Sequence, residues 1–580
     1  MEKILPILKF LFFNFDYFLS AIIILLFIFI KDNAKFRLKD EIIKTGGFIG
    51  NLFNKLAAVK TEKLLISFFI INFLIRFLMA LPVPAIGAMA DIVAPHYLNL
   101  ARSLYQGRGF TTEVIWNNFM QEPNIIRPDF FRVPFYPFLV FLFYKIFGYS
   151  FLSAKLVNVL IGGILPIISY AFASAITKSK KIATLLLILI SFNGLLFTLV
   201  VISYPEIVYT ACFIATLYFL YLSREKIGFL NVLAGIFLAL TYLSRTEGLY
   251  ILLPVIIFTF LYRQNKKIFL PKFALVAFGF LIIAAPYLAR NYFLTKNPFY
   301  SDFDKIAMLT FVDSGTMIES PSFEYNNIYE MALKEPGEIT FWVSKKIIDG
   351  LILIPRALLY SYILTILALI GVYSFFKNNK EKCNFLLITM FFHYIIIAAS
   401  IGFTDRYFTP LLIIFCLFIS LGIKKIYQIS SSFKKSLLTI YLAIFIIFNG
   451  LGGIIQGTMP YIPHSFYKRF DAKQYFSDTQ IFYDYIKKNT DRNDVFMVSR
   501  RPYTINYFIE RPVIIFPFTD EKGIQEFMKK YNVKWLIWMG QPSKIDGKYW
   551  KFFLPNEIPE NVKLIYKNTG GELFKVEYYK

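Results

Sequence analysis

The sequence predicts a mainly α-helical, polytopic transmembrane bundle followed by a small α/β domain. Of its 580 residues, 57% are hydrophobic and only 17% are charged, and the mean hydropathy of +0.55 is well above that of water-soluble domains. Between Leu64 and Gly452, apolar stretches of about 17 to 25 residues recur, each long enough to cross a hydrocarbon core of roughly 30 Å as a helix. From about Gly457 onward these stretches stop, and charged residues, proline and glycine are spaced as in a soluble domain.

We therefore expect three regions, covering residues 1–63, 64–456 and 457–580. The first begins with an apolar segment, Met1 to Ile30, which is followed by basic residues and lacks a small-residue cleavage site. This pattern predicts a retained membrane anchor instead of a cleaved signal peptide. The basic stretch from Lys31 to Lys63, with its apolar "GGFIGNLFNKL", is typical of a cytoplasmic segment at the membrane interface.

The second region should contain most of the membrane spans, about eleven to thirteen in all. Short basic loops, such as "KSKK" at Lys178 and "RQNKK" at Arg263, are expected in the cytoplasm by the positive-inside rule. This assignment places the long loops at 81–133 and 286–349, and the C-terminal domain, on the extracytoplasmic side. The expected spans are 64–81, 153–177, 182–203, 205–222, 227–244, 248–262, 272–289, 351–376, 384–403, 407–423 and 437–456.

One apolar stretch, Phe135 to Phe147, conflicts with this alternation, because counting it as a span would place Lys178 outside. It is also short for a crossing, and Pro134 and Pro137 stand at its start. We predict a juxtamembrane or re-entrant helix packed against protein.

The tail from about Tyr461 shows the alternating elements of a small α/β domain. Two helical patterns, "TQIFYDYIKKN" and "EKGIQEFMKKY", separate strand patterns at "DVFMVS", "PVIIF" and "VKWLIWM", and "VKLIY" and "ELFKVEYY" follow. The net charge of +24 is spread over short loops and forms no continuous basic face, so the composition does not indicate a nucleic-acid partner. The three cysteines offer neither zinc-ligand spacing nor a disulfide framework.

Six short motifs suggest where the chemistry lies. The first, "MADIVAPHYLNLARSLYQGRGF", places an acid directly after a span and before an amphipathic helical pattern. The others follow in order as "RPDFFRVPFYPFLVFLFYKIFG", "SYPEIVYT", "LSRTEGLYILLP", "APYLARNYFLTKNPFYSD" and "TDRYFTPLL". Together they resemble the GT-C superfamily of membrane glycosyltransferases, which includes protein O-mannosyltransferases and the lipid A aminoarabinose transferase. The resemblance covers roughly residues 64–422, and its first motif rests on Asp91, Tyr97, Ala101, Leu104, Gly107, Gly109 and Phe110.

The resemblance implies an enzyme that moves a hexose, pentose or amino sugar from a polyprenyl-phosphate donor to an extracytoplasmic lipid, glycan or protein. A single displacement would invert the anomeric configuration. Asp91 would be the general base, and Glu206 a second catalytic acid. Several GT-C families carry another acid directly after the first, whereas this sequence has Ile92. The ordinary alternatives are a solvated loop acid or helix cap for Asp91 and a polar span end for Glu206.

Further residues are expected to bind substrate, because guanidinium groups can hold a departing lipid phosphate bidentately. For Arg290 and Arg406, both at outer span ends, the competing explanation is headgroup anchoring. For Arg245 the competing explanation is pairing with Glu247, and for Arg132 it is pairing with nearby Asp129. The predicted substrate-binding residues are Tyr97, Arg132, Arg245, Glu247, Arg290, Arg406 and Tyr407.

No cofactor is certain from the sequence. His96, His393 and His464 are too scattered to suggest a ligand cluster, but a divalent metal is possible, with Asp91 and Glu206 as its nameable ligands. Two other function classes compete, a transporter or flippase for a lipid-linked substrate and a noncatalytic scaffold. A transporter would usually show repeated halves or ionisable residues in mid-span, whereas the ionisable residues here gather at outer span ends.

Overall fold

A computed structural model describes residues 37–88, 93–116, 122–261, 266–302, 330, 333–354, 361–400, 405–458, 472–517, 521–539 and 562–577. The chain folds into two compact units, each assembled from separate segments. The helical unit comprises Met1–Leu81, Lys155–Arg290 and Val343–Met459. The mixed unit comprises Pro82–Ala154, Asn291–Trp342 and Pro460–Lys580. The N-terminal segment expected to be an anchor lies outside the described residues.

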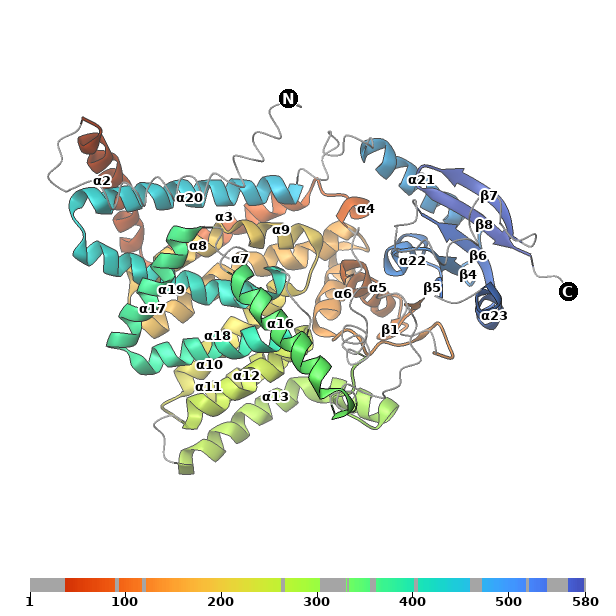
Figure 1. The fold of residues 1–580 in the computed structure, drawn as a ribbon, viewed down its shortest axis with the longest axis horizontal. Coiled ribbons are helices and arrows are strands. Elements are labelled where there is room, and N and C mark those ends of the chain that lie inside the picture. The colour runs from red at the N-terminus through yellow and green to blue at the C-terminus, as the bar shows by residue number, and fades with distance from the viewer. Residues whose placement is uncertain are drawn as a thin grey trace. The chain divides into compact units, whose positions relative to one another are not determined.

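The helical unit consists mainly of long apolar helices (Figure 1). Three of them, α7, α13 and α16, belong to it only in part, because their ends fall in the ranges of the mixed unit. Most of the predicted spans coincide with helices to within a few residues. The helices are α2 (Arg37–Ala58), α3 (Thr61–Ala80), α7 (Phe151–Thr177), α8 (Lys180–Ser191), α9 (Gly194–Ile202), α10 (Glu206–Ser223), α11 (Phe229–Ser244), α12 (Glu247–Leu261), α13 (Lys266–Thr295), α16 (Pro336–Ile354), α17 (Tyr362–Asn378), α18 (Lys380–Ser400), α19 (Thr409–Ile429) and α20 (Ser432–Thr458), with the short 3-10 helix η3 (Asp405–Phe408) before α19.

Among the described residues, seven helices are long and apolar enough to cross a membrane, and the α8–α9 pair, bent by 48°, would be an eighth. Four shorter apolar helices are α6 (Phe135–Phe147), α11, α12 and α17. Three of these four fall where spans are expected. The fourth, α6, has 13 residues and would extend only about 20 Å at the usual rise per residue. That it does not cross the membrane stays a prediction.

One predicted span is wrong. The sequence suggested a single helix over 351–376, but α16 ends at Ile354 and α17 begins at Tyr362. Pro355, which follows α16 in the sequence, cannot donate a helical hydrogen bond and disfavours helical backbone in the residue before it. The new helix has its own cap, because the Ser361 side chain accepts a hydrogen bond from the backbone N–H of Leu364.

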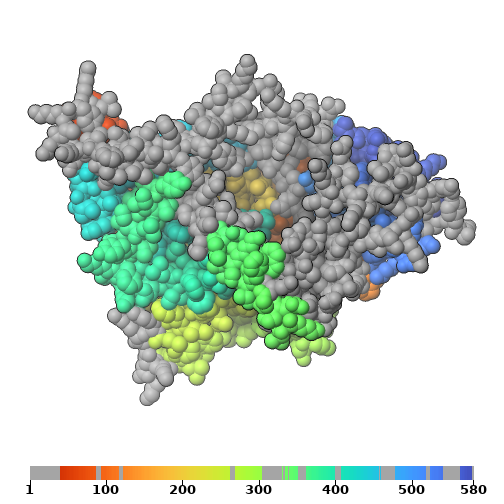
Figure 2. All heavy atoms as spheres, viewed as in Figure 1, coloured from red at the N-terminus to blue at the C-terminus, as the bar shows by residue number. Residues whose placement is uncertain are grey.

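Helix α17 illustrates how these helices divide their surface between protein and surroundings. Its inner face touches α19 through glycine: a Cβ on Gly371 would lie 1.9 Å from the Phe418 carbonyl oxygen, and one on Gly422 would lie 1.9 Å from that of Leu367. Such close backbone approach at small residues is typical of helices packed in a bilayer. The outer face, visible in Figure 2, carries large exposed apolar residues at helical spacing, namely Tyr362, Ile366, Leu369, Tyr373 and Phe376.

The mixed unit is built on a six-stranded sheet with the order β2-β5-β4-β6-β8-β7. Its strands are β2 (Val114–Ile115), β4 (Val495–Val498), β5 (Val513–Ile515), β6 (Val533–Trp538), β7 (Val562–Asn568) and β8 (Gly571–Val576). The first four run parallel, and β8 pairs antiparallel with both β6 and β7. Side chains that alternate along the strands pack on α21 (Ala472–Asn489) and α22 (Pro502–Ile509) on one face, and on α23 (Glu521–Lys530) on the other.

The sheet also draws on the first long loop, since β2 precedes the tail by hundreds of residues. The loop adds the helices α4 (Ala85–Ala88), α5 (Val93–Tyr105) and α6, and the strands β1 (Thr111–Thr112) and β3 (Arg127–Pro128) pair with each other. Helix α20 ends at Thr458, next to the boundary expected near Gly457. The compact unit beyond that boundary nevertheless contains the loop as well as the tail.

Buried polar contacts join loop and tail. The Arg102 guanidinium on α5 donates to the backbone oxygens of Asn506 and Tyr507, at 3.0 and 3.1 Å, and to Oδ1 of Asn506 at 2.7 Å. Nearby, the Asn99 amide donates to the backbone oxygen of Tyr503 at 2.9 Å. A buried guanidinium needs such acceptors, so these contacts hold α5 firmly against α22.

Candidate functional site

The candidate site begins at the turn between α9 and α10. The first helix ends at Ile202, and Ser203 then adopts a left-handed conformation with φ 61°. The side-chain amide of Asn158 secures the turn by donating to the backbone oxygens of Leu199 and Tyr204, at 3.3 and 2.9 Å. After Pro205, Glu206 becomes the first residue of α10, and it is completely buried.

Two guanidinium groups surround the buried Glu206 carboxylate. Its Oε1 lies 3.0 Å from Nη1 of Arg245 and 3.7 Å from Nε of Arg406. Its Oε2 has no hydrogen-bond partner among the described residues. The other Arg245 amino group, Nη2, lies 3.0 Å from Oε1 of Glu247. A buried carboxylate is costly unless it is paired, and the two arginines supply that pairing for Glu206.

Aromatic rings enclose the arginines. The Arg245 guanidinium carbon lies 4.3 Å from the ring centroid of Tyr407, and that of Arg406 lies 4.5 Å from the ring centroid of Tyr204. Nη2 of Arg406 also donates to the Tyr407 hydroxyl at 3.1 Å. These rings hold the cations over their faces. We call Glu206, Arg245, Glu247, Arg406 and Tyr407 the Glu206 cluster.

His393 on α18 lies beside this cluster. It is fully buried, with ring centroids 5.5 Å from Phe213 on α10 and 6.0 Å from Phe408 in η3. Neither ring nitrogen has a hydrogen-bond partner among the described residues. Its sequence context is an unbroken apolar helix, so no motif distinguished it. Only the packing of α18 against η3 brings it near the arginines.

A second polar group lies in the mixed unit. The Arg132 guanidinium carbon is 5.0 Å from the ring centroid of Tyr97, and its Nε donates to Nδ1 of His96 at 3.4 Å. Nε2 of His96 lies 2.7 Å from Oδ2 of Asp129, whose Oδ1 accepts the backbone N–H of Arg132 at 2.8 Å. If Nδ1 accepts, Nε2 must carry the proton of a neutral imidazole that donates to Asp129.

The pKa shifts agree with that tautomer. Burial lowers the pKa of His96, and Arg132 adds to the effect, although Asp129 opposes it. Burial alone would raise the pKa of Asp129, but His96 and the Arg132 backbone N–H together bring that pKa below its usual value. The expected local pairing of Arg132 with Asp129 thus runs through the backbone, while the guanidinium contacts His96 and Tyr97. No sequence pattern indicated the His96–Asp129 pair.

Comparison with known proteins identifies the architecture. The chain matches ArnT from Cupriavidus metallidurans bound to undecaprenyl phosphate with a TM-score of 0.53 and 9% identity, over 89% of this chain and 98% of that one. The chain has the fold of the GT-C superfamily of membrane glycosyltransferases. The Archaeoglobus fulgidus oligosaccharyltransferase in complex with zinc and sulfate gives a TM-score of 0.55 at 14% identity, over 88% and 73% of the two chains. AglB from the same organism, with an inhibitory peptide and a dolichol-phosphate, gives 0.52 at 12% identity, over 90% and 75%.

Sequence comparison adds a family match over part of the chain. Residues 127–289 match the family described as dolichyl-phosphate-mannose-protein mannosyltransferase. The matched range includes Glu206, Arg245 and Glu247. No curated protein matches this sequence.

The GT-C fold brings together most of the predicted site residues. Glu206, Arg245, Glu247, Arg406 and Tyr407 form one cluster in the helical unit, while Tyr97 and Arg132 contact each other in the mixed unit. Arg290, on α13, has its guanidinium carbon 6.0 Å from the ring centroid of Tyr287 on the same helix. The predicted base, Asp91, lies outside the described residues. Within the described residues, no group of three or more histidine, cysteine and acidic side chains could hold a metal.

Proposed function

We propose that this GT-C protein transfers a sugar from a polyprenyl-phosphate donor to an extracytoplasmic lipid, glycan or protein, and that the Glu206 cluster binds the donor phosphate. The observation that carries the proposal is the convergence of Arg245 and Arg406 on one buried carboxylate beneath tyrosine rings. Guanidinium groups in a poorly solvated site are well suited to a lipid phosphate. The matched ArnT and AglB structures contain undecaprenyl phosphate and a dolichol-phosphate, respectively, which supports this ligand class.

The two arginines have different roles in this proposal. Arg245 is held by two carboxylates at 3.0 Å, so its charge is already matched. Arg406 lies farther from Glu206, at 3.7 Å, and its side chain is 16% exposed, compared with 10% for Arg245. Arg406 is therefore the better phosphate ligand, because a phosphate oxygen can replace its longer contact at little cost. Glu206 then serves as a positioning residue that keeps both guanidinium groups in place.

The reaction is a single displacement. The acceptor hydroxyl oxygen forms a bond to the anomeric carbon as the bond between that carbon and the phosphate oxygen breaks. The bonding electrons leave on the polyprenyl phosphate, where Arg406 stabilises the departing charge. The hydroxyl proton passes to a carboxylate, for which the family resemblance indicates Asp91. Attack from the opposite face inverts the anomeric configuration.

The test is transfer from radiolabelled polyprenyl-phosphate sugars in membranes that contain the protein, with Arg406→Gln as the main variant. We expect donor affinity and turnover both to fall, by about 10²-fold in kcat/KM, because an arginine–phosphate contact in a poorly solvated site is lost. Arg224→Gln, at the opposite end of α10, is the matched control and should transfer normally. Normal transfer by Arg406→Gln would overturn the phosphate assignment. Movement of the intact lipid-linked sugar across the membrane without any product would favour the transporter alternative.

A further inference from the structure

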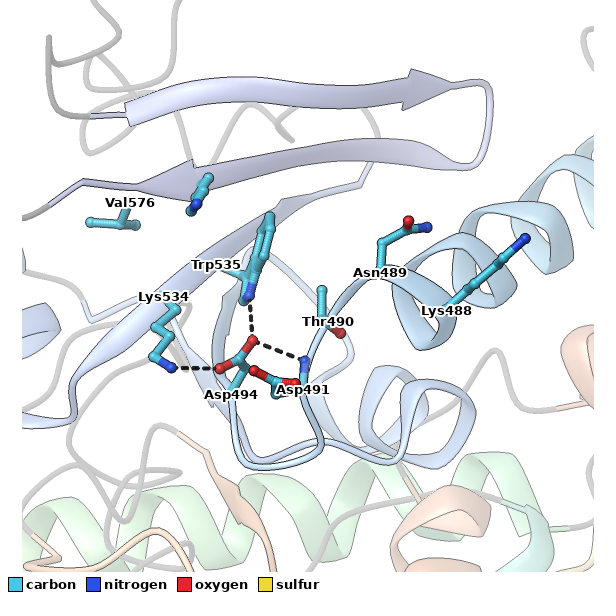
Figure 3. Close-up of a pocket in the computed structure, with 9 residues that line it drawn as sticks. Lys488, Asn489, Thr490, Asp491, Asp494, Lys534, Trp535 and Val576 are labelled. Atoms are coloured by element: carbon cyan, nitrogen blue, oxygen red, sulfur yellow. Dashed lines mark hydrogen bonds and ion pairs between the residues drawn. The ribbon is translucent and has the colours of Figure 1, made fainter.

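A polar cavity of about 470 Å³ lies in the mixed unit where α21 ends above the sheet. Figure 3 shows Lys488 and Asn489 extending from the end of this helix, with Trp535 and Lys534 on the strand opposite. Lys575 and Asp491 complete the part of the lining that the argument uses. The volume is within the range of small-molecule sites and far exceeds what one ordered water needs.

The wall of the cavity is held in place by Asp494. Its carboxylate accepts from Nζ of Lys534 at 2.8 Å, from Nε1 of Trp535 at 2.9 Å and from the backbone N–H of Asp491 at 3.1 Å. These contacts outweigh the effect of burial and lower the pKa of Asp494, so the group stays ionised. The charges of Asp494 and Lys534 therefore neutralise each other, and the indole is fixed in one orientation.

A row of side chains across the sheet gives the cavity an aromatic wall and a basic rim. Trp535 stands between Phe496 on β4 and Lys575 on β8, and Lys575 stands opposite Lys563 on β7. The rings of Phe496 and Trp535 are nearly parallel, at 14°, so one indole face is covered by protein. Two lysines directly opposite each other repel, and Lys488 adds a third cation at the cavity. A bound anion would offset this repulsion.

We propose that this cavity binds a sugar residue that carries a negative charge. The ring of the sugar lies against the indole of Trp535, and its phosphate or carboxylate group lies between Lys488 and Lys575. Asp491 accepts hydrogen bonds from sugar hydroxyls. The choice of a sugar over another anionic ligand rests on the proposed transferase function. The basic rim and the aromatic wall are observed independently of that function.

Binding can be measured by titration calorimetry on the full-length protein in detergent, without any lipid donor. The probes are glucose 6-phosphate and glucuronate, compared with glucose and inorganic phosphate. We expect at least one charged sugar to bind about tenfold or more tightly than either comparison ligand. The double variant Lys488→Gln/Lys575→Gln should weaken that binding about five- to tenfold, as expected for two partly screened charges. Lys529→Gln, on α23 at the opposite face of the sheet, should not change it.

Trp535→Phe tests the aromatic wall, because it removes the indole N–H and part of the ring area while leaving an aromatic side chain. Weaker binding by this variant supports the proposal, provided that circular dichroism shows wild-type folding. If the variant does not fold, the double variant of the exposed Lys488 and Lys575 supplies the test. Three outcomes would each overturn the site: no binding of either charged sugar, equal binding of inorganic phosphate, or wild-type affinity in the double lysine variant. The assay measures binding and needs no sugar transfer. Failure of the charged sugars to bind therefore leaves the transferase proposal untouched, and a protein without transferase activity can still be tested for this site.

Discussion

Replacing Glu206 by Gln should destabilise the helical unit strongly. The variant keeps the size of the side chain and one acceptor oxygen, but it removes the carboxylate charge that lies 3.0 Å from Arg245 and 3.7 Å from Arg406. Breaking a buried ion pair by neutralising one partner typically costs 3–5 kcal/mol. Here Arg245 keeps its 3.0 Å contact with Glu247, and a neutral hydrogen bond to the amide remains. We therefore expect a loss near the lower limit, about 3 kcal/mol in the free energy of unfolding.

Chemical denaturation in detergent micelles can measure this loss, with Glu225→Gln as the matched control. Glu225 forms a 3.1 Å ion pair with Arg224, but its side chain is 74% exposed, so its neutralisation should change stability very little. A double-mutant cycle with Arg406→Gln separates positioning from other roles. If Glu206 acts by holding Arg406, its substitution should reduce transfer far less when Arg406 is already absent. A Glu206→Gln protein as stable as the wild type would refute the buried ion-pair reasoning.

Three further predictions follow from the loop residues, the orientation and the mixed unit. Asp91→Asn should retain folding and donor binding but lose about 10²-fold or more in turnover, since the amide can cap a helix but cannot accept the proton; wild-type transfer rates would remove the base assignment. An impermeant thiol reagent should label a cysteine introduced at Asp546 in intact cells but not one at Lys178, and the reverse pattern would overturn the orientation. The mixed unit should lose stability as the pH falls below 6.5, because His96 is buried neutral with a lowered pKa while the unfolded chain gains a proton there. Thermal unfolding measured from pH 8 to 5 checks this loss of stability. The His96→Gln variant should lose less stability below pH 6.5 than the wild type.

The resemblance to GT-C proteins located most residues of the candidate site, but it did not indicate which of these residues contact one another. Arg245 and Glu247 are two residues apart at adjoining helix ends, so their contact was a natural expectation, and the structure confirms it. Glu206 and Arg245 are 39 residues apart, and nothing local indicated that they would meet. His393 and the His96–Asp129 pair were missed for the same reason. Their partners come from other elements, and a histidine inside an apolar helix has no distinctive spacing.

The sequence by itself determined the helices, because apolar stretches of membrane length must satisfy their own backbone hydrogen bonds, and it determined most strands of the tail through their alternation. The prediction missed α22, and it missed the break between α16 and α17 although Pro355 and Ser361 lie in that part of the sequence. Only the tertiary structure decided that β2 of the first long loop joins the tail in one sheet, and that Glu206, Arg245 and Arg406 share one buried site. Such contacts depend on how distant segments pack, since burial and charge pairing are settled by neighbours that no local pattern contains.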